Sequence, residues 1–495
     1  MIRTNRRVVV VGNGMVGSRF VADLLERDLD RDLDITVIGA EPGGAYNRIL
    51  LSNVLAGAAR PNDVTLASEA WYAAQGVTLR AGIEVVAIDR ITRTVELADR
   101  SRLPYDVLVL ATGSDPVVPP VPGLTNERSQ LIDGAVVFRT LDDCAEIERR
   151  VRTAGRAIVV GGGLLGLAAA RGLVGRGVPV TVVQRGPCLM DQQLDLGAST
   201  VLARTLRKAG IDVVTDAVVR SVRGGDVVCG ITLDDGTEIH GDLLVLCCGV
   251  RPRVGLARNA GLAVRAGIMV DDELRCITDR DIYAIGECAE HDGRIYGLVA
   301  PGWEQARVAA TVVTGRQASY AGSAVVTRLK AAGVELAAMG ETVPDDEDDI
   351  RFVDGAHGVY QKLVVRDGRL VGAILLGDTR AAGTVTQLFD RGGALPADRS
   401  ALLMVRRNSP VTTVGSPTAL PGQATICQCN GVTKTAICDA WQDGARCVDE
   451  IATQTRATTG CGTCRDTVQG LVDWLAAADA GVRAVATTDV EAVPA

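Results

Sequence analysis

Two glycine-rich turns, each lying between an apolar strand and a helix, predict an α/β fold with two Rossmann-like domains. A later run of short strands predicts a small α+β domain. Two close cysteine pairs near the end of the 495-residue chain predict a small, largely helical metal-binding domain. A chain of this length is expected to form several domains, each with its own core.

The composition is that of a globular protein. Hydrophobic residues make up 47% of the chain and charged residues 23%. A net charge of −8 and an aromatic content of 3% argue against a nucleic-acid partner. Neither a signal peptide nor an apolar run long enough to span a membrane is visible, so we expect a cytoplasmic protein without a membrane partner. In that compartment the 13 cysteines are expected to be thiols and metal ligands.

The first glycine motif lies close to the start of the chain. An apolar strand at 8–11 leads into the turn and a helix, and a second strand at 35–38 is followed by Glu41. The glycines of the turn are Gly12, Gly14 and Gly17. Glycines at this spacing let the backbone approach a pyrophosphate at the helix N-terminus, and the acid can bind a ribose hydroxyl.

The same pattern is repeated later in the chain. A strand at 157–160 leads into a second turn and helix, and a strand at 180–183 follows. The glycines of this turn are Gly161, Gly163 and Gly166. Two fingerprints in one chain predict two bound dinucleotides, which is a more specific signal than one.

Further strands end in small residues that can line a site. The strand at 106–111 ends at Thr112 and Gly113, and a later strand at 281–285 is followed by Gly286 and Glu287. Ligands of open α/β sheets bind at the carboxyl ends of the strands, so we expect these residues beside a cofactor.

Together these motifs resemble the two-dinucleotide flavoprotein reductases, which bind FAD in the first Rossmann-like domain and a nicotinamide in the second. More closely, residues 5–475 resemble the reductase part of assimilatory nitrate and nitrite reductases. The segments that carry this resemblance are 45–57, 189–195, 284–288, 296–300 and 303–306.

The resemblance implies roles for particular residues. The FAD pyrophosphate and ribose would be held by Gly12, Gly14, Gly17 and Glu41. Arg48, Thr112 and Gly113 would lie beside FAD, with Gly286 and Glu287 near its ribityl chain. Gly161, Gly163 and Gly166 would hold the nicotinamide dinucleotide. No catalytic side chain is assigned, because the redox chemistry belongs to the cofactors.

One departure from the family pattern lies near the flavin. Related reductases often carry a lysine where this chain has Asn53 and a glutamate where it has Ala168, and the two side chains pair. Because a lone buried charge is costly, the loss of both is more consistent than the loss of one. We expect flavin and nicotinamide still to stack, with different tuning of the flavin N5.

A second departure concerns the nicotinamide cofactor. Gln184 takes the place of the acid expected after strand 180–183, and Arg185 follows it. An acid there favours the free ribose of NADH, whereas an arginine can accept the 2′-phosphate of NADPH. Arg185 tilts the prediction towards NADPH. Because a shift of the strand end by one residue would change this reading, the predicted cofactor stays NAD(P)H.

The resemblance and the composition together divide the chain into domains. We expect an FAD-binding domain at 1–120 and 249–320, with an NAD(P)-binding domain at 121–248 between its parts. The remaining segments are a reductase C-terminal α+β domain at 323–403, a linker at 404–424, a [2Fe–2S] domain at 425–478 and a disordered tail at 479–495. The turn at Asp367 and Gly368 predicts a hairpin in the α+β domain.

The cysteine pairs are a C-x-C and a C-x-x-C, which let two thiolates of one loop bind the same metal centre. The segments 434–442, 448–453 and 466–478 are expected to be helical. This module resembles the [2Fe–2S] domain of bacterioferritin-associated ferredoxin, which implies Cys427, Cys429, Cys461 and Cys464 as ligands. A structural zinc site is the main alternative, although C-x-C is less usual for zinc.

The resemblance implies a chain of carriers, in which NAD(P)H reduces FAD and FAD passes single electrons to the [2Fe–2S] cluster. We see no cysteine set for a [4Fe–4S]–sirohaem centre and no molybdopterin-sized domain, so a separate catalytic subunit is expected. Assimilatory nitrate reductase is the favoured partner, and a nitrite reductase with its sirohaem on another chain comes next.

Other functions stay open at this point. A ferredoxin- or rubredoxin-type reductase would use the same two dinucleotide domains. An iron-sensing or iron-storage accessory protein could use the cluster for docking, but two intact dinucleotide motifs argue against it. The resemblance also allows a homodimer formed through the α+β domain.

Overall fold

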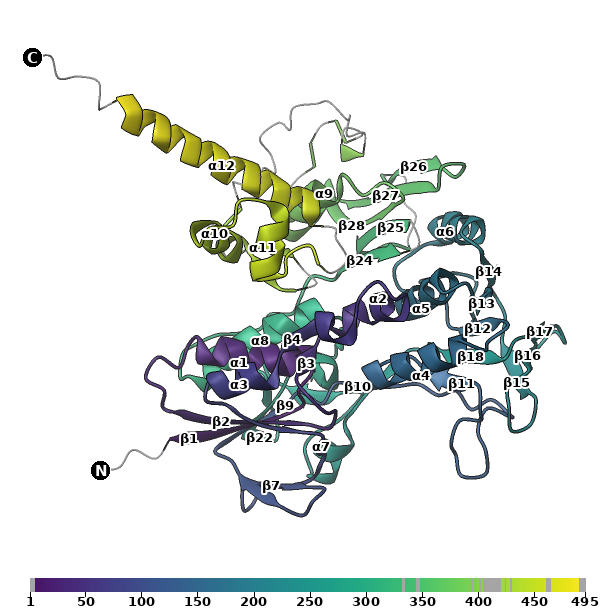
Figure 1. The fold of residues 1–495 in the computed structure, drawn as a ribbon, viewed down its shortest axis with the longest axis horizontal. Coiled ribbons are helices and arrows are strands. Elements are labelled where there is room, and N and C mark those ends of the chain that lie inside the picture. The colour runs from purple at the N-terminus through teal and green to yellow at the C-terminus, as the bar shows by residue number, and fades with distance from the viewer. Residues whose placement is uncertain are drawn as a thin grey trace, which may run out of the picture. The chain divides into compact units, whose positions relative to one another are not determined.

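The protein is represented by a computed structural model (Figure 1). The structure describes residues 5–331, 334–343, 348–392, 395–396, 398–399, 402–403, 420–422, 424–427, 430–459 and 464–488. The chain divides into two compact units, one formed by Met1–Asp191 with Leu206–Val325 and the other by Gln192–Thr205 with Val326–Ala495. No helix among the described residues is both long and apolar enough to cross a membrane.

The first unit contains a mixed sheet with the strand order β23-β20-β21-β22-β9-β1-β2-β5. Its strands are β1 (Arg6–Val11), β2 (Leu33–Gly39), β5 (Thr78–Ala81), β9 (Val107–Leu110), β20 (Ile268–Val270), β21 (Arg275–Cys276), β22 (Asp279–Ala284) and β23 (Ala289–His291). β1 lies parallel to both β2 and β9, with Val8 opposite Ile35 and Val107. The inner parts of these central strands are apolar, as expected of a sheet that is covered on both faces.

Helices cover one face of this sheet, and a small antiparallel sheet lies on the other side (Figure 1). The helices are α1 (Met15–Leu25), α3 (Glu69–Ala74) and α8 (Val299–Val313), and α1 packs against α8. The small sheet consists of β6 (Val85–Asp89), β7 (Thr94–Leu97) and β8 (Arg102–Pro104), and α7 (Gly255–Asn259) contacts β6. Shorter elements are β3 (Ala45–Tyr46), η1 (Arg48–Leu50), α2 (Leu51–Leu55), η2 (Pro61–Val64), β4 (Thr65–Ala67) and η3 (Gly286–Cys288).

A second, all-parallel sheet in the same unit has the order β11-β18-β12-β13-β14. Its strands are β11 (Ala135–Val137), β12 (Ala157–Val160), β13 (Val180–Val183), β14 (Ile211–Val214) and β18 (Leu243–Leu246). The neighbouring helices are α4 (Leu141–Val151) and α5 (Leu164–Gly175), whereas most of α6 (Leu196–Lys208) belongs to the second unit. A side sheet is formed by β15 (Val219–Arg223), β16 (Gly230–Leu233) and β17 (Glu238–His240), and the crossing strands β10 (Ser114–Pro116) and β19 (Val250–Pro252) pair antiparallel.

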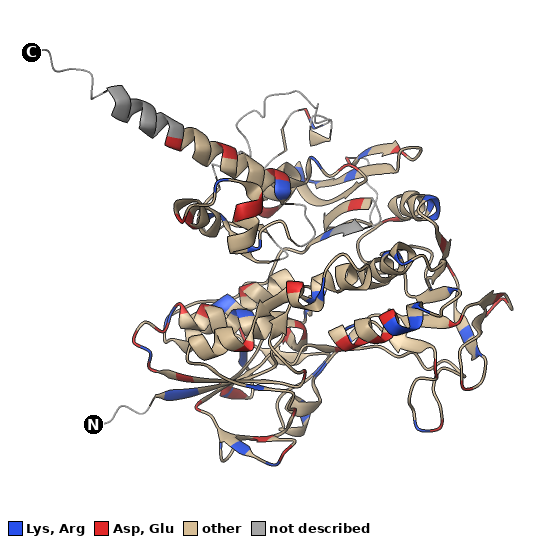
Figure 2. Cartoon of the chain, in the orientation of Figure 1, with Lys and Arg blue, Asp and Glu red and all other residues tan. Residues whose placement is uncertain are grey.

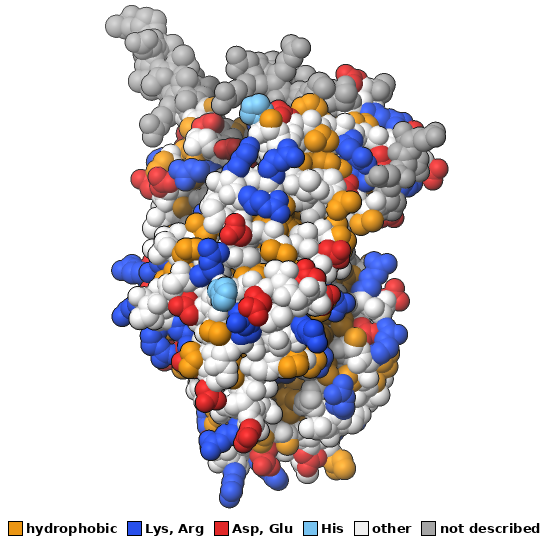
Figure 3. Space-filling view, turned by 90° about the vertical axis from the view of Figure 1, so that its right-hand side faces the viewer, with side chains coloured by type: hydrophobic (Ala, Val, Ile, Leu, Met, Phe, Trp, Pro, Cys, Tyr) orange, Lys and Arg blue, Asp and Glu red, His pale blue; other side chains and the backbone are white. Residues whose placement is uncertain are grey.

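Charged side chains are arranged to stabilise helix ends and are mixed over the surface. In Figure 2, α4 has acidic residues at its start and basic residues at its end, which complements the helix dipole. The side chain of Thr140 caps this helix by accepting a hydrogen bond from the backbone N–H of Asp143. On the face shown in Figure 3, basic and acidic side chains are interspersed among the coloured residues.

The second unit contains an antiparallel sheet of order β24-β25-β28-β27-β26. Its strands are β24 (Val326–Ala331), β25 (Val334–Gly340), β26 (Ile350–Asp354), β27 (Val359–Arg366) and β28 (Arg369–Leu376), and α9 (Ala382–Arg391) packs against β25 and β28. β27 and β28 form the predicted hairpin, with φ values of 51° at Asp367 and 70° at Gly368. Two consecutive positive φ angles are the geometry of a tight hairpin turn.

The cysteine module is a small helical body. Its elements are β29 (Thr425–Cys427), β30 (Val432–Thr433), α10 (Lys434–Gln442), α11 (Val448–Thr455) and α12 (Arg465–Thr488). Ile437, Ile451 and Leu471 are fully buried in its core. The expectation that the last helix ends at residue 478 is wrong, because α12 continues to Thr488. The alanine-rich sequence beyond 475 has a high helix propensity, which favours continuation of the helix into the segment expected to be a tail.

Both Rossmann-like sheets, the small α+β sheet and the helical module are therefore present, and the predicted fold class is confirmed.

Candidate dinucleotide sites and metal centre

The first glycine turn contains one glycine that the fold itself does not require. Gly12 has a φ of 117°, and a Cβ there would lie 2.1 Å from the carbonyl oxygen of Ala111. A Cβ at Gly17 would lie 2.0 Å from the oxygen of Gly12. A Cβ at Gly14, by contrast, would have no atom within 4 Å. Two glycines are thus fixed by packing, and the middle one faces open space at the N-terminus of α1.

The second glycine turn has the same construction. Gly161 has a φ of 113°, and its Cβ would lie 2.2 Å from the oxygen of Cys247. A Cβ at Gly166 would lie 1.8 Å from the oxygen of Gly161, and a Cβ at Gly163 would meet nothing within 4 Å. Backbone N–H groups at the start of a helix attract anions, so both open turns can hold a phosphate group.

Glu41 and Arg48 come together at the carboxyl end of β2. The guanidinium of Arg48 forms an ion pair with Glu41 and lies 4.9 Å from the ring centre of Tyr46. The Tyr46 hydroxyl donates a hydrogen bond of 2.6 Å to Glu41, and burial raises the pKa of that hydroxyl, so it remains a donor. Arg48 also donates to the carbonyl oxygen of Arg139 at 3.1 Å. A carboxylate in this place can accept hydrogen bonds from ribose hydroxyls.

Glu287 belongs to a polar cluster that sequence reasoning did not find. Ser114 donates to the Glu287 carboxylate at 2.6 Å, and Arg139 forms an ion pair with the same carboxylate. Arg139 also donates to the Ser114 hydroxyl at 2.7 Å. Neither Ser114 nor Arg139 lies in a glycine motif, and both reach Glu287 only through the fold. The sequence signal for Ser114 was its position directly after Thr112 and Gly113.

Helix α8 holds the strand end that carries Gly286 and Glu287. Gln305 accepts a hydrogen bond of 2.7 Å from the backbone N–H of Gly286, and the indole of Trp303 donates to the carbonyl of Met15 at 3.2 Å. The segment at 303–306 therefore connects the end of β22 with the start of α1. These contacts fix the loop that carries Glu287 beside the first glycine turn.

Thr112 and Gly113 lie where the chain crosses from the first sheet to β10. The Thr112 hydroxyl donates to the carbonyl of Arg253 at 2.8 Å, and the N–H of Arg253 donates to the carbonyl of Gly113 at 2.9 Å. Gly113 has a φ of 70°, a conformation that favours glycine. Through these hydrogen bonds, Thr112 and Gly113 hold the crossing strands at the carboxyl end of β9, the edge of the sheet where a cofactor is expected.

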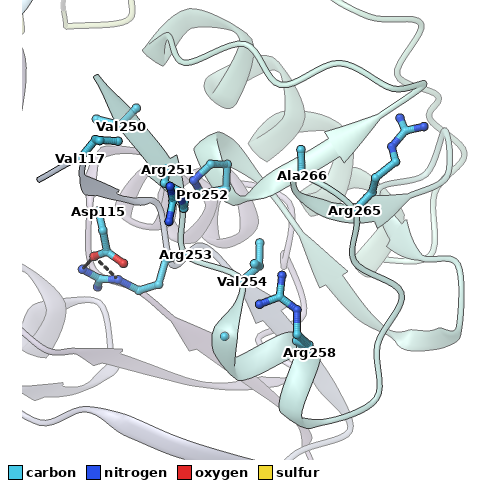
Figure 4. Close-up of a pocket in the computed structure, with 11 residues that line it drawn as sticks. Asp115, Val117, Val250, Arg251, Pro252, Arg253, Val254, Arg258, Arg265 and Ala266 are labelled. Carbon is cyan, nitrogen blue, oxygen red and sulfur yellow. Dashed lines mark hydrogen bonds and ion pairs between the residues drawn. The ribbon is translucent and has the colours of Figure 1, made fainter. Parts of the chain in front are cut away.

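A pocket of about 710 Å³ lies next to this crossing. Figure 4 shows its basic side chains, with Arg253 paired to Asp115. Arg265 is paired with Glu290, whereas neither Arg251 nor Arg258 takes part in an ion pair within the described part of the chain. The pocket contains none of the residues predicted to bind a dinucleotide, so it is distinct from both glycine turns.

Gln184 and Arg185 directly follow β13, as predicted from the sequence. β13 ends at Val183, so Gln184 is the first residue after the strand. Its side-chain Oε1 accepts a hydrogen bond of 2.8 Å from the backbone N–H of Gly162, inside the second glycine turn. Arg185 is exposed. The N–H of Met190 donates to the carbonyl of Gly162 at 3.0 Å, which folds the segment at 189–195 back onto the turn.

Asn53 and Ala168 lie on two helices that pack together, α2 and α5. A Cβ at Gly172 of α5 would lie 2.9 Å from the side chain of Leu55 in α2. Arg176 fastens the end of α5 to α2 through a hydrogen bond of 2.9 Å to the carbonyl of Leu55. The two uncharged residues are thus found on neighbouring helices, as expected of positions that carry a charge pair in related reductases.

One cysteine of each pair lies in the core of the helical module. Cys427 ends β29 and is 2% exposed, and Cys464 precedes α12 and is 7% exposed. Both belong to the same buried cluster as Ile437. Cys429 and Cys461 lie outside the described residues. Thiols from both pairs in one buried cluster suit a metal centre with sulfur ligands.

Comparison with known families agrees with these sites. Residues 6–312 match the pyridine nucleotide-disulphide oxidoreductase family. Residues 326–392 match the rubredoxin NAD⁺ reductase C-terminal domain, and residues 425–474 match the BFD-like [2Fe–2S] binding domain.

Two curated relatives come from Bacillus subtilis. A nitrite reductase [NAD(P)H] is 37% identical over 94% of this chain and 57% of its own length. An assimilatory nitrate reductase electron transfer subunit is 37% identical over 95% of this chain and 60% of its own length. The chain thus spans little more than half of each relative.

Two solved structures share the fold at 26% identity. A ferredoxin reductase from Rhodopseudomonas palustris superposes with a TM-score of 0.72 over 79% of this chain and 96% of its own. Putidaredoxin reductase, in its covalent complex with putidaredoxin, gives a TM-score of 0.72 over 81% of this chain and 96% of its own.

These matches identify the cofactors as FAD, NAD(P)H and a [2Fe–2S] cluster. The two open glycine turns fit two dinucleotide phosphates, and the buried thiols fit an iron–sulfur centre. The chain belongs to the pyridine nucleotide-disulphide oxidoreductase family and carries a BFD-like [2Fe–2S] domain after its reductase domains.

Proposed function

We propose that the chain is an NAD(P)H-dependent electron-transfer subunit that supplies a separate catalytic partner, with assimilatory nitrate reductase as the favoured partner. The observation that supports this is the presence, in one chain, of two open glycine turns and of two buried cysteines, one from each pair, in the same hydrophobic cluster. FAD, when bound, can take two electrons from NAD(P)H and release them singly, which suits a one-electron carrier such as a [2Fe–2S] cluster.

The chain's own residues bind and orient these cofactors. We assign the FAD pyrophosphate to the N–H groups of the first turn and its ribose to Glu41. Arg48 and Arg139 would hold the carboxylates of Glu41 and Glu287 in place through their ion pairs. The second turn, with Gln184 and Arg185, would bind the nicotinamide dinucleotide.

The cysteine module would carry electrons out of the reductase. We assign the four thiolates of Cys427, Cys429, Cys461 and Cys464 as the cluster ligands. We also propose that the domains predicted from the sequence are the functional units of the chain. In this proposal the [2Fe–2S] domain at 425–478 follows a linker at 404–424. A cytoplasmic location and a homodimer belong to the same proposal.

The names of the relatives support a partner in nitrogen assimilation, since one is an assimilatory nitrate reductase electron transfer subunit. The second candidate is the reductase component of a nitrite reductase. The other Bacillus subtilis relative, a nitrite reductase, supports it with the same sequence identity of 37%. A ferredoxin- or rubredoxin-type reductase is the third candidate, supported by the matches to ferredoxin reductase and to the rubredoxin NAD⁺ reductase C-terminal domain.

Reconstitution distinguishes these partners. The full chain, loaded with its cofactors, is mixed with a molybdenum-containing nitrate reductase catalytic subunit or with a sirohaem nitrite reductase subunit. We expect NAD(P)H oxidation coupled to nitrate consumption, and loss of this coupling in a Cys464→Ser variant whose flavin is still reduced. Coupling to nitrite alone, or to rubredoxin alone, would assign the second or third function instead.

A further inference from the structure

The side-chain amide of Asn430 joins the two loops that carry the cysteine pairs. Its Nδ2 lies 3.8 Å from the Sγ of Cys427, within the range of a hydrogen bond to sulfur. The same nitrogen lies 2.7 Å from the carbonyl oxygen of Arg456 and 3.1 Å from the hydroxyl oxygen of Thr459. Asn430 directly follows the C-x-C pair, whereas Arg456 and Thr459 precede the C-x-x-C pair.

The turn that receives this amide adopts a conformation that needs support. Arg456 ends α11 with a φ of 65°, and Thr458 has a φ of 69°. Such left-handed conformations are unfavourable for residues other than glycine unless neighbouring groups hold them. The Thr459 hydroxyl donates to the carbonyl of Arg456 at 2.8 Å, and the Asn430 amide donates to the same carbonyl. The path of the chain into the second cysteine pair is therefore tied to Asn430.

We propose that Asn430 is a positioning residue for the [2Fe–2S] cluster, which fixes the spacing of the two cysteine loops and donates an N–H···S hydrogen bond to Cys427. This inference rests on the proposed ligand role of Cys427. A hydrogen bond to a ligand sulfur stabilises the more electron-rich, reduced cluster and raises its reduction potential. An aspartate would keep the shape of Asn430, lose both N–H donors and place a negative charge beside the sulfur.

The test compares Asn430→Asp with Gln469→Glu in the full chain. Gln469 lies exposed on α12, where its amide donates to Asp473, so the control makes the same amide-to-acid change at a different position of the module. The cluster potential is measured by a dye-mediated titration that follows the EPR signal of the reduced cluster, together with iron and sulfide content. We expect Asn430→Asp to lower the equilibrium constant for cluster reduction at least tenfold, a shift of about 59 mV for one electron, with the Gln469→Glu control unchanged.

An unchanged potential in a fully loaded Asn430→Asp protein would overturn the inference. If Asn430→Asp binds no cluster, Asn430→Ala removes the donors without adding charge and is measured in the same way. Loss of the cluster in both variants, with the near-ultraviolet circular dichroism of the module retained, would support the positioning role. Loss of the cluster together with that signal would make Asn430 a purely structural residue and contradict the proposal.

The wild-type protein separates this inference from the proposed function. Zinc in place of iron in the wild type would contradict the proposed [2Fe–2S] cluster, whatever Asn430 does. If the wild type binds a [2Fe–2S] cluster and the variants have the same cluster reduction potential as the wild type, only the proposed role of Asn430 is contradicted.

Discussion

The side-chain Oε1 of Gln184 accepts a hydrogen bond of 2.8 Å from the backbone N–H of Gly162. This contact places an uncharged amide at the end of β13, where an acid would bind the ribose of NADH and repel a 2′-phosphate. The exposed Arg185 follows it directly. We therefore predict a preference for NADPH, which the positive charge of Arg185 would favour.

The cofactor preference can be measured by fluorescence binding of NADPH and NADH. Arg185→Ala should weaken NADPH binding about tenfold, because a charge-assisted hydrogen bond to phosphate contributes about 1.5–3 kcal/mol. NADH binding should change little. Arg220→Ala, which removes an exposed arginine from β15, serves as the control. Equal losses for both nucleotides in Arg185→Ala would show that Arg185 does not contact the 2′-phosphate.

Substitutions in the first glycine turn should separate folding from FAD binding. A Cβ at Gly14 would meet no atom within 4 Å, so the apoprotein of Gly14→Ala should keep the melting temperature of the wild-type apoprotein, and the variant should lose bound FAD. Gly17→Ala would bring a Cβ to 2.0 Å from the oxygen of Gly12, so the melting temperature of the apoprotein should fall. Differential scanning fluorimetry and the flavin-to-protein ratio give the two readouts. Full FAD content in Gly14→Ala would contradict a pyrophosphate site at this turn.

Lys362 forms a buried charge cluster in the second unit. Its side chain is fully buried, with Nζ 3.4 Å from the carboxylate of Asp195 and 3.8 Å from that of Asp349. The hydroxyl of Tyr360 donates to Asp195 at 2.6 Å. Without Lys362 the Asp195 carboxylate loses its ion pair, whereas Asp349 keeps its ion pair with Arg366 at 3.1 Å. Removing one member of a buried ion pair costs about 3–5 kcal/mol.

We therefore expect Lys362→Met to lower the free energy of unfolding by about 3 kcal/mol or more. A double variant, Lys362→Met with Asp195→Asn, should recover part of that loss, because the carboxylate charge that lost its partner is gone. Urea denaturation followed by circular dichroism measures both. A Lys362→Met protein as stable as the wild type would show that the cluster contributes no net stability.

The pair between Arg7 and Asp106 predicts a pH dependence. The hydrogen bond from Arg7 lowers the pKa of Asp106 to about 2. A lowered folded-state pKa stabilises the protein above the ordinary aspartate pKa, and this contribution is lost as the pH falls towards about 2. Because the pair is about one-third exposed or more, solvent screening limits its contribution to about 1 kcal/mol or less.

Asp106→Asn should accordingly be slightly less stable than the wild type at pH 7, with the difference shrinking between about pH 4 and pH 2. Asp226→Asn, an exposed acid of the same unit, is the control. Urea unfolding at several pH values gives the comparison. A stability difference that grows on acidification would contradict the assigned direction of the pKa shift.

The features predicted from sequence are those that arise from local patterns. Glycine spacing and strand periodicity are properties of neighbouring residues, so both turns and the end of β13 at Val183 could be placed in advance. The hairpin at Asp367 and Gly368 follows from turn chemistry for the same reason.

The features that sequence reasoning missed depend on residues that meet only in the folded chain. Arg139 reaches Glu287 across 148 positions of sequence, and no spacing rule predicts such a pair. Lys362 lies in a strand predicted from the sequence, but its burial depends on Asp195, which comes from a distant segment. The end of α12 was misplaced, because the alanine-rich segment beyond 475 has a helix propensity that favours continuation of the helix.

The most direct test of the proposed electron path is an anaerobic titration of the full chain with NADPH and NADH, followed by visible absorption. We expect the flavin and iron–sulfur bands both to bleach, and only the flavin band to be present and to bleach in Cys427→Ser. A protein that contains zinc without iron, or a cluster that neither nucleotide reduces, would contradict the proposal that these residues form a chain of carriers.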